Sequence, residues 1–361
     1  MKRRHVLIGG AIAAAGIATY AATRGPSYEA ASAAIWAQKS PQDLSRLDYL
    51  VHHATLAANS HNTQPWLFSG DSDQVTIRPD LARTTPVVDP DSHHLFASLG
   101  CAAENLSLAA SASGRSSAVD FLGDTSEIRI GLGGDGAVRD PLFDAIYDRQ
   151  CTRSLYDGRQ VPARDLKLLE DAAQVAGCSV MLVTAKPRME QFLDLILSAN
   201  AAQITDPAFV TELKHWLRFN ATEAIRHGDG LYSACSGNPT MPSWVANLVF
   251  GLAFTAEAEN AKCAEQVRSS AGFAVFVSDK DDKSHWVQAG RSYQRFALAS
   301  TALGIRHAFL NQPVEVAEFR PQLSALLGIG GKRPDLVVRF GYANAMPRSL
   351  RRPVSDVLVA A

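Results

Sequence analysis

The chain has 361 residues, of which 47% are hydrophobic, enough material for one large folded unit or two ordinary domains. Its 35 Lys and Arg residues balance 36 Asp and Glu residues, and this lack of a dominant charge argues against nucleic-acid binding. The cysteines are scattered and form no C-x-x-C pair, which argues against a disulfide framework and a zinc site. The sequence therefore predicts no metal site.

The first 26 residues differ from the rest of the chain. Lys2, Arg3 and Arg4 precede a charge-free run at 6–23 that is rich in Ala and Gly. This pattern is typical of a twin-arginine export signal, and its weak apolarity favours a signal over a permanent anchor. No clear cleavage site follows, so an uncleaved tether stays open. We expect an exported protein that is periplasmic or tethered to the inner membrane.

The first half of the remaining chain alternates helix and strand signals. Apolar residues at helical spacing predict a helix over 44–58, which leads into the polar segment "ANSHNTQPW" at 58–66. An alternating strand is expected over 74–80, followed by a proline-containing loop at 83–91. A long apolar helix then runs from about His94 to Ser113 and ends at a glycine.

The second half has strand patterns at 179–184 and 272–279, then a helix over 284–303 and a final strand over 335–343. A long insert at 206–259 separates the first two strands. An insert of this length usually forms a lid or a separate subregion.

The two long helices share an internal repeat. With an offset of 190 residues, Gly100 aligns with Gly290 and Gly114 with Gly304, and both copies read G-x7-L-A-x2-A-x-G. Phe121-Leu122 and Phe309-Leu310 follow close to the same register. The repeat favours two related halves that pack as a homodimer does, with the long helices in the shared core.

Three polar clusters could carry the function. Side-chain amides in "SHNTQPW" offer donors and acceptors in one plane and suit the edge of a flat polar ring, although an ordinary helix stop explains the segment equally well. Arg149 and Arg153 flank Cys151 and Thr152, and forked guanidinium donors suit a phosphate monoester. A solvated basic turn is the alternative. A further basic run lies at 347–354.

Together these segments resemble the nitroreductase family, most closely its Acg-like, fused-dimer branch. The resemblance rests on "SHNTQPW", on "RPDLARTTPVVDPD" with "LGCAAENLSLAASASG", on the R-x3-R at 149–153, and on "FALASTALGIRHAFLNQP", and it extends through "RRPV". It implies an α+β, nitroreductase-like fold made of two related halves fused into an intramolecular pseudo-dimer. The halves would span 40–145 and 146–358, with the lid insert in the second, and FMN would bind at the seam.

The resemblance also implies which residues contact FMN. The amide segment would follow the ring edge or ribityl chain, and the segment after Phe309 would border the ring near N5. Arg149 would hold the phosphate, with Arg351 or Arg352 completing that site, and Arg153 would lie near the phosphate or the pyrimidine end of the ring. The implied contacts are Ser60, His61, Asn62, Gln64, Arg149, Thr152, Arg153, Leu310, Asn311, Gln312, Arg351 and Arg352.

This sequence departs from the family pattern at two positions. Cys151 stands where relatives have a hydroxyl residue, with Thr152 one place later, and Asn311-Gln312 stands where many relatives have an acidic residue and glycine. No second "HNTQPW" occurs in the later half, so one FMN per chain is expected.

The implied activity is two-electron transfer through flavin N5 to a small aromatic or quinone-type acceptor, with no catalytic side chain required because the cofactor carries the reaction. Nicotinamide cofactors are scarce outside the cytoplasm, so a membrane quinol or a redox partner is a possible donor. The alternative is a non-enzymatic protein that binds or sequesters FMN beneath a closed lid. We expect a monomer with an internal pseudo-dimer.

Overall fold

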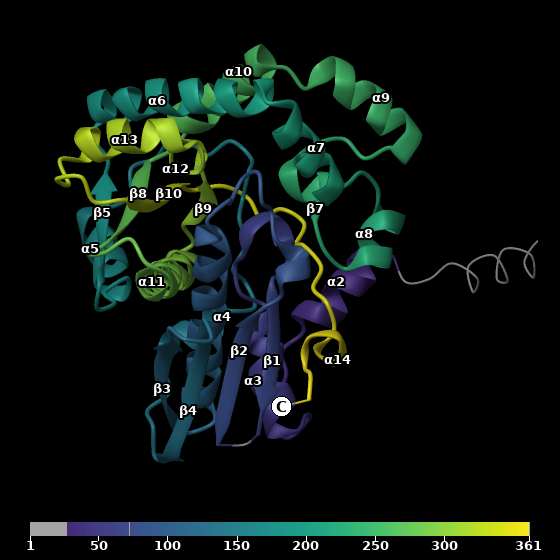
Figure 1. Ribbon diagram of the computed structural model, residues 1–361, viewed down its shortest axis with the longest axis vertical. Helices are drawn as coiled ribbons and strands as arrows, with labels where there is room; N and C mark the ends of the chain where they lie inside the picture. Colours follow the sequence, from purple (N-terminus) through teal and green to yellow (C-terminus); the bar gives the residue numbers. More distant parts are fainter. Residues whose placement is uncertain (1–26, 72, 361) are drawn as a thin grey trace, which may run out of the picture.

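The computed structural model describes residues 27–71 and 73–360, so the expected export signal lies outside the described residues. Two four-stranded antiparallel sheets lie in the lower and upper parts of the molecule, with long helices between them (Figure 1). In spatial order, the first sheet contains β1 (Trp66–Gly70), β2 (Gln74–Pro79), β4 (Glu127–Asp135) and β3 (Arg115–Leu122), and the second contains β5 (Cys178–Val183), β8 (Gly272–Ser278), β10 (Pro334–Gly341) and β9 (Arg306–Phe309).

The two sheets have the same topology. Each half runs strand, strand, long helix, strand, strand, and the spatial order of the strands is identical in both halves. The long helix is α4 (His93–Ala112) in the first half and α11 (Lys283–Ala302) in the second. The expected α+β fold with two related halves is therefore confirmed.

The central helices touch through the repeated glycines. A Cβ placed on Gly100 would lie 2.1 Å from the carbonyl oxygen of Val287, and a Cβ on Gly290 would lie 1.9 Å from that of Ala97. Since 97 and 287 are also 190 residues apart, the two contacts are equivalent and reciprocal. Such reciprocity is the signature of a two-fold symmetric interface, here formed within one chain.

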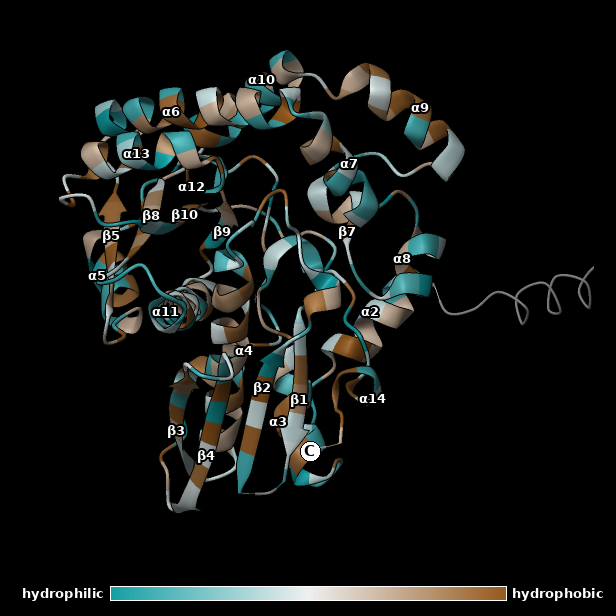
Figure 2. Cartoon of the chain, in the orientation of Figure 1, coloured by the Kyte–Doolittle hydropathy of each residue, from teal (hydrophilic) through white to brown (hydrophobic). Residues whose placement is uncertain are grey.

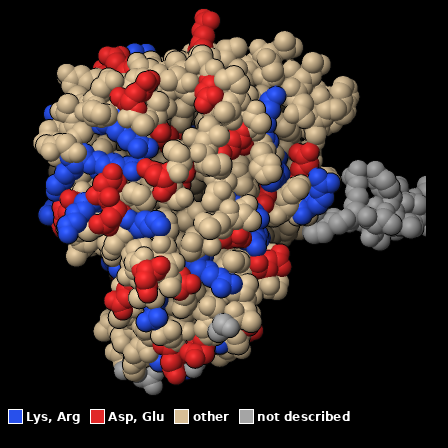
Figure 3. All heavy atoms as spheres, viewed as in Figure 1, with Lys and Arg blue, Asp and Glu red and all other residues tan. Residues whose placement is uncertain are grey.

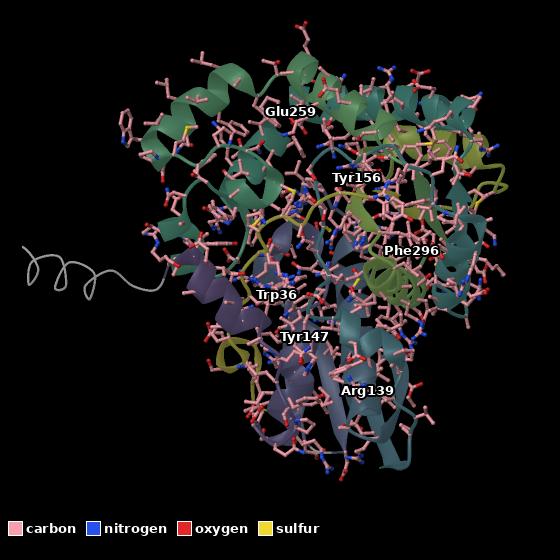
Figure 4. The ribbon with its side chains drawn as sticks, turned by 180° about the vertical axis from the view of Figure 1, so that it is seen from behind. Trp36, Arg139, Tyr147, Tyr156, Glu259 and Phe296 are labelled. Carbon is pink, nitrogen blue, oxygen red and sulfur yellow. The ribbon has the colours of Figure 1, made fainter. Side chains whose placement is uncertain are left out.

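The second sheet is buried on both faces because successive side chains of a strand point to opposite sides. In β8, Ala274 and Phe276 face the core around α11, where Phe296 also lies, whereas Phe273 and Val275 pack against outer helices (Figure 4). Figure 2 shows apolar residues along strands of the second sheet and in α4. Charges of both signs are mixed over the face seen in Figure 3, in agreement with the balanced composition.

The second half differs mainly in the connection between its first two strands. In the first half this connection is a short hairpin, whereas β5 and β8 are separated by five α-helices, a short 3-10 helix (Ser233–Ser236) and a two-stranded parallel pair. The excursion begins earlier than the insert expected at 206–259 and ends after it. Its elements are α6 (Lys186–Thr205), α7 (Pro207–Trp216), β6 (Leu217–Arg218), α8 (Ala221–His227), β7 (Leu231–Tyr232), α9 (Ser243–Ala253) and α10 (Ala256–Arg268).

The C-terminal segment returns to the first half. The backbone N–H of Val359 donates to the carbonyl of Phe68 at 2.8 Å, beside the edge strand β1. Across the described ranges, no helix combines the length and apolarity needed to cross a bilayer. The remaining helices are α2 (Tyr28–Trp36), α3 (Arg46–Thr55), α5 (Ala163–Ala172), α12 (Gln312–Glu315), α13 (Arg320–Leu327) and α14 (Val354–Val357).

Candidate functional site

A cavity of about 470 Å³ lies where the two halves and the long excursion meet. This volume is in the range of small-molecule and cofactor sites. Ala58 to His61 border it from the first half, and Cys151, Arg153 and Phe309 to Gln312 border it from the second. The excursion adds an apolar wall that includes Phe250 and Phe254, and Glu259 of α10 borders the cavity near the top of the molecule (Figure 4). The two segments singled out by the resemblance therefore meet at one cavity.

The polar segment after α3 has a strained backbone. His61, Asn62 and Gln64 all have positive φ values of 48°, 53° and 54°. Side chains other than glycine rarely adopt this conformation, and it persists only where surrounding contacts enforce it. One such contact is the bond from the backbone N–H of Gln64 to Oδ1 of Asn59, at 2.9 Å. Ser60 and His61 of this loop line the cavity.

The amides of Asn62 and Gln64 bond to protein groups and are not among the residues that line the cavity. Nδ2 of Asn62 donates to the carbonyls of Gly230 and Leu350, and its Oδ1 accepts from Arg351. Gln64 donates to the carbonyl of Gly228 and accepts from the backbone N–H of Arg352. These amides fasten the excursion and the C-terminal segment to the strained loop.

The basic segment sends only some of its residues to the cavity. Among the described residues, the half-buried guanidinium of Arg153 makes no hydrogen bond or ion pair, and it lines the cavity. Arg149 is buried and donates to the carbonyl of Leu56. Thr152 is buried and bonds to Gln150, so Cys151 is the neighbour that faces the cavity. Arg153 is thus the cation best placed for an anionic ligand.

The two C-terminal arginines are engaged elsewhere. Arg351 is buried and donates to the carbonyls of Thr55 and Ala57 as well as to Asn62. Arg352 lies near Asp80 and donates to the carbonyl of Asp356. Neither lines the cavity. Of the residues expected to contact a cofactor, those at the cavity are Ser60, His61, Arg153, Leu310, Asn311 and Gln312, and those away from it are Asn62, Gln64, Arg149, Thr152, Arg351 and Arg352. Contact with a cofactor stays a prediction for all of them.

One face of α4 also lines the cavity and was not predicted. His94, Ala97, Ser98 and Cys101 follow the spacing i, i+3, i+4, i+7, which places them on one side of a helix. The spacing was visible in the sequence, but the small side chains looked like ordinary core. Glu315 gave no sequence signal, because only the fold brings it to the cavity, whereas residues of the insert at 206–259, which the sequence suggested as a lid, do line the cavity.

The cavity combines a neutral imidazole with a partly buried acid, Glu315. Burial lowers the pKa of His61 to about 4, so this side chain is neutral at pH 7. Burial would raise the pKa of Glu315, but hydrogen bonds from His94 and Gln203 and the charge of His94 outweigh it and keep the pKa below its usual value. Oε1 of Gln312 is buried without a hydrogen-bond partner in the described structure, which leaves an acceptor available to a ligand.

Comparison with known proteins points to one enzyme class. No protein-family model matches the chain. The chain is 26% identical over 324 residues to the putative NAD(P)H nitroreductases MT3217 and Rv3131 of Mycobacterium tuberculosis strains CDC 1551 and H37Rv, covering 84% of this chain and 88% of each relative. Over most of its length the chain is therefore similar to proteins named as nitroreductases.

Solved structures of the same class also align with the chain. They include the FMN-dependent nitroreductase NfnB from Mycobacterium smegmatis in complex with NADPH, with 14% identity, 59% of this chain and 94% of that chain covered, and a TM-score of 0.40. A nitroreductase with bound FMN from Desulfitobacterium hafniense DCB-2 aligns with 16% identity, 62% and 98% coverage, and a TM-score of 0.39.

Proposed function

We propose that the protein is an FMN-dependent oxidoreductase of the nitroreductase family, of the Acg-like fused-dimer branch, that holds one FMN in the cavity between its halves. The observation that carries this proposal is the cavity itself, bordered by the strained polar loop on one side and the unpaired Arg153 on the other. Similarity to curated nitroreductases over 84% of the chain supports the same class.

The residues present fit such a cofactor. A phosphate needs a cation that is not already paired with another group. Arg153 is such a cation, and its guanidinium offers forked N–H donors to the phosphate oxygens. The unpartnered Oε1 of Gln312 can accept a ring N–H, and the half-buried Ser60 and His61 offer further polar atoms. The apolar wall formed by the excursion can cover a flat ring and exclude water. When bound, FMN supplies two-electron transfer between a donor and an acceptor.

The chain's own residues then position and shield the reaction. Neutral His61 can hydrogen-bond an acceptor without adding charge, while Arg153 places a positive charge at the cavity. We propose a small nitroaromatic or quinone-type molecule as the acceptor, because Phe250 and Phe254 give the wall a surface suited to flat apolar compounds.

The location of the protein bears on its electron donor. We propose that residues 1–26 direct export by the twin-arginine route, which carries proteins already folded with their cofactor, and that the mature protein is periplasmic or tethered. A membrane quinol or a redox partner would then replace NAD(P)H as the donor.

A second candidate function is FMN binding without turnover. It is favoured by the fastening of the excursion, since Asp229 pairs with both Arg83 and Arg218, and Gly228 and Gly230 bond to the strained loop. A lid held by this many contacts would keep substrates away from a bound flavin.

One experiment tests both candidates. The purified full-length chain should show a flavin absorption spectrum, and heat release should yield about one FMN per polypeptide. Bleaching by a quinol or NADPH, followed by recovery on adding a quinone, indicates the oxidoreductase. Bleaching by dithionite alone indicates the closed, non-catalytic protein. A chain that neither contains nor takes up FMN would overturn both.

A further inference from the structure

A second cluster of polar side chains lies where α4 begins. Asp89, His93 and His94 are all buried, and each offers one atom able to bind a metal, with these atoms within 4.8 Å of one another. None of the cysteines takes part. The sequence did not predict this cluster, because the side chains of two consecutive helical residues usually point in different directions.

The hydrogen bonds of the two histidines leave their facing nitrogens in conflict. Nε2 of His93 lies 2.9 Å from Oδ1 of Asp335, and Nε2 of His94 lies 3.4 Å from Oε1 of Glu315. Each carboxylate favours the proton on the Nε2 atom beside it, which leaves Nδ1 of each ring with a lone pair. These two Nδ1 atoms face each other at 3.1 Å. Two lone pairs at that distance repel, so either a metal ion or a proton must lie between the two nitrogens.

The negative charge around the two histidines also favours a cation. Asp89, Asp335 and Glu315 are three largely buried carboxylates next to two imidazoles. The guanidinium of Arg333 pairs directly with Asp91 and Asp281 and makes no ion pair with these three carboxylates in the described structure. Buried carboxylates are stabilised by nearby positive charge, so the cluster favours a cation, either a metal ion or a proton on His94.

We propose that Nδ1 of His93, Nδ1 of His94 and a carboxylate oxygen of Asp89 bind one divalent transition-metal ion, such as Zn²⁺. Zinc binds imidazole nitrogen at about 2.0–2.1 Å, so two nitrogens about 3 Å apart can both reach one ion. Two imidazoles and one carboxylate form a ligand set typical of zinc and iron(II) rather than of calcium or magnesium.

The surroundings match those of known metal sites in proteins. Histidine ligands usually donate their second N–H to a carboxylate, which fixes the tautomer and the ring orientation, and Asp335 and Glu315 occupy that place here. Asp89 accepts from the backbone N–H groups of His94 and Leu95 at 2.9 Å, and its oxygens keep further lone pairs for an ion. These two bonds also offset the positive end of α4, which would otherwise oppose a cation. His94 lines the cavity, which provides a route of entry.

The test uses the full-length protein without a histidine tag. The protein is first treated with a chelator to remove bound metal and is then titrated with Zn²⁺ in a calorimeter. We expect saturable binding of about one Zn²⁺ per chain, with release of protons if a proton occupies the position between the two nitrogens beforehand. Mg²⁺ should give no signal. Because the experiment measures Zn²⁺ bound per chain, its result does not depend on whether the protein binds FMN.

Variants separate this site from other histidines. His94→Gln should abolish the binding, and Asp335→Asn, which keeps the side-chain shape, should weaken it about 10–100-fold by loss of the carboxylate behind His93. The exposed His227→Gln is the control and should bind as the natural chain does. Absence of saturable Zn²⁺ binding, or unchanged binding by folded His94→Gln and Asp335→Asn proteins, would overturn the proposal and leave a shared proton as the occupant.

Discussion

Arg153 is the residue on which the proposed phosphate site depends most. It carries the one half-buried cation of the 149–153 segment that lines the cavity, and in the described structure its guanidinium has no partner. Arg153→Gln should weaken FMN binding about 10–100-fold, since a charge-assisted hydrogen bond contributes about 1.5–3 kcal/mol. Riboflavin, which lacks the phosphate, should bind the variant and the natural chain alike. Fluorescence titration with both flavins measures this difference.

The control for that prediction is Arg159→Gln. Arg159 is exposed, pairs with Asp157 and does not line the cavity, so its replacement should leave both affinities unchanged. Equal weakening of FMN and riboflavin in the Arg153 variant would place the phosphate elsewhere in the cavity.

Gln64 tests whether the loop beside the cavity stores strain. Its φ of 54° is unfavourable for any side chain, and its amide bonds to Gly228 and Arg352. Both Gln64→Ala and Gln64→Gly lose these hydrogen bonds, but only glycine accepts the backbone conformation freely. The glycine variant should therefore be more stable than the alanine variant by about 1 kcal/mol in urea unfolding. If the alanine variant is the more stable one, the loop relaxes without cost.

Sequence analysis located the site better than it assigned individual side chains. The family resemblance implied that the polar and basic segments meet around one cofactor, and both do border the cavity. It could not predict that Asn62 and Arg351 would bond to each other rather than to a ligand, since their partners lie almost 290 positions apart. Only the folded chain decides which polar group faces a cavity and which faces another segment.

Among the contacts between elements, the packing of α4 against α11 depends most strongly on particular residues, the glycines at the crossing. A Cβ on Gly290 would meet a backbone carbonyl rather than a flexible side chain, so the two helices would have to move apart. Gly290→Ala should reduce the free energy of unfolding by about 1–3 kcal/mol or more, as overpacking of a core does. Chemical denaturation gives this value directly.

The matched control is a glycine in an open helix. Gly251 of α9 has no atom within 4 Å of an added Cβ, so Gly251→Ala should be neutral or stabilising by about 0.5–1 kcal/mol through helix propensity alone. A Gly290→Ala protein as stable as the natural chain would show that the helix crossing tolerates separation.

The elements that sequence patterns predicted are those with strong periodicity. The long helices and the strands β2, β5, β8 and β10 lie within a residue or two of the expected ranges, because their apolar residues follow clear periods. Strands β1, β3, β4 and β9 were missed. β3 and β4 carry serine, glycine and charged residues on a half-exposed sheet, and β9 has only four residues, so neither hydrophobicity nor length marked them.

At the scale of the whole molecule, two halves of one topology serve a single cavity. The first half supplies the strained loop and one face of α4, while the second supplies Arg153 and the wall of the excursion. Only the second half carries the long excursion, so the equivalent place on the first half has no comparable cover. Fusion of the halves into one chain permits this asymmetry, which identical subunits of a dimer could not develop independently.

Buried histidines should make the whole fold sensitive to mild acid. Burial, together with the nearby Arg149 and Arg306, lowers the pKa of His307 to about 3, and burial lowers the pKa of His53 to about 4. Below about pH 6.5 the unfolded chain takes up protons that the folded chain excludes, so stability falls as the pH is lowered through this window. Each such histidine can cost up to about 1.4 kcal/mol per pH unit.

His307 allows this loss to be measured at one position, since neither of its ring nitrogens has a hydrogen-bond partner in the described structure. His307→Leu should keep the burial and remove the titration, so the slope of unfolding free energy between pH 7 and pH 5 should become shallower by up to about 1.4 kcal/mol per unit. Urea midpoints at fixed ligand content give the slope, and His285→Gln, near the surface beside Asp282, is the control. An unchanged slope in the leucine variant would mean that His307 titrates as freely in the fold as in the unfolded chain.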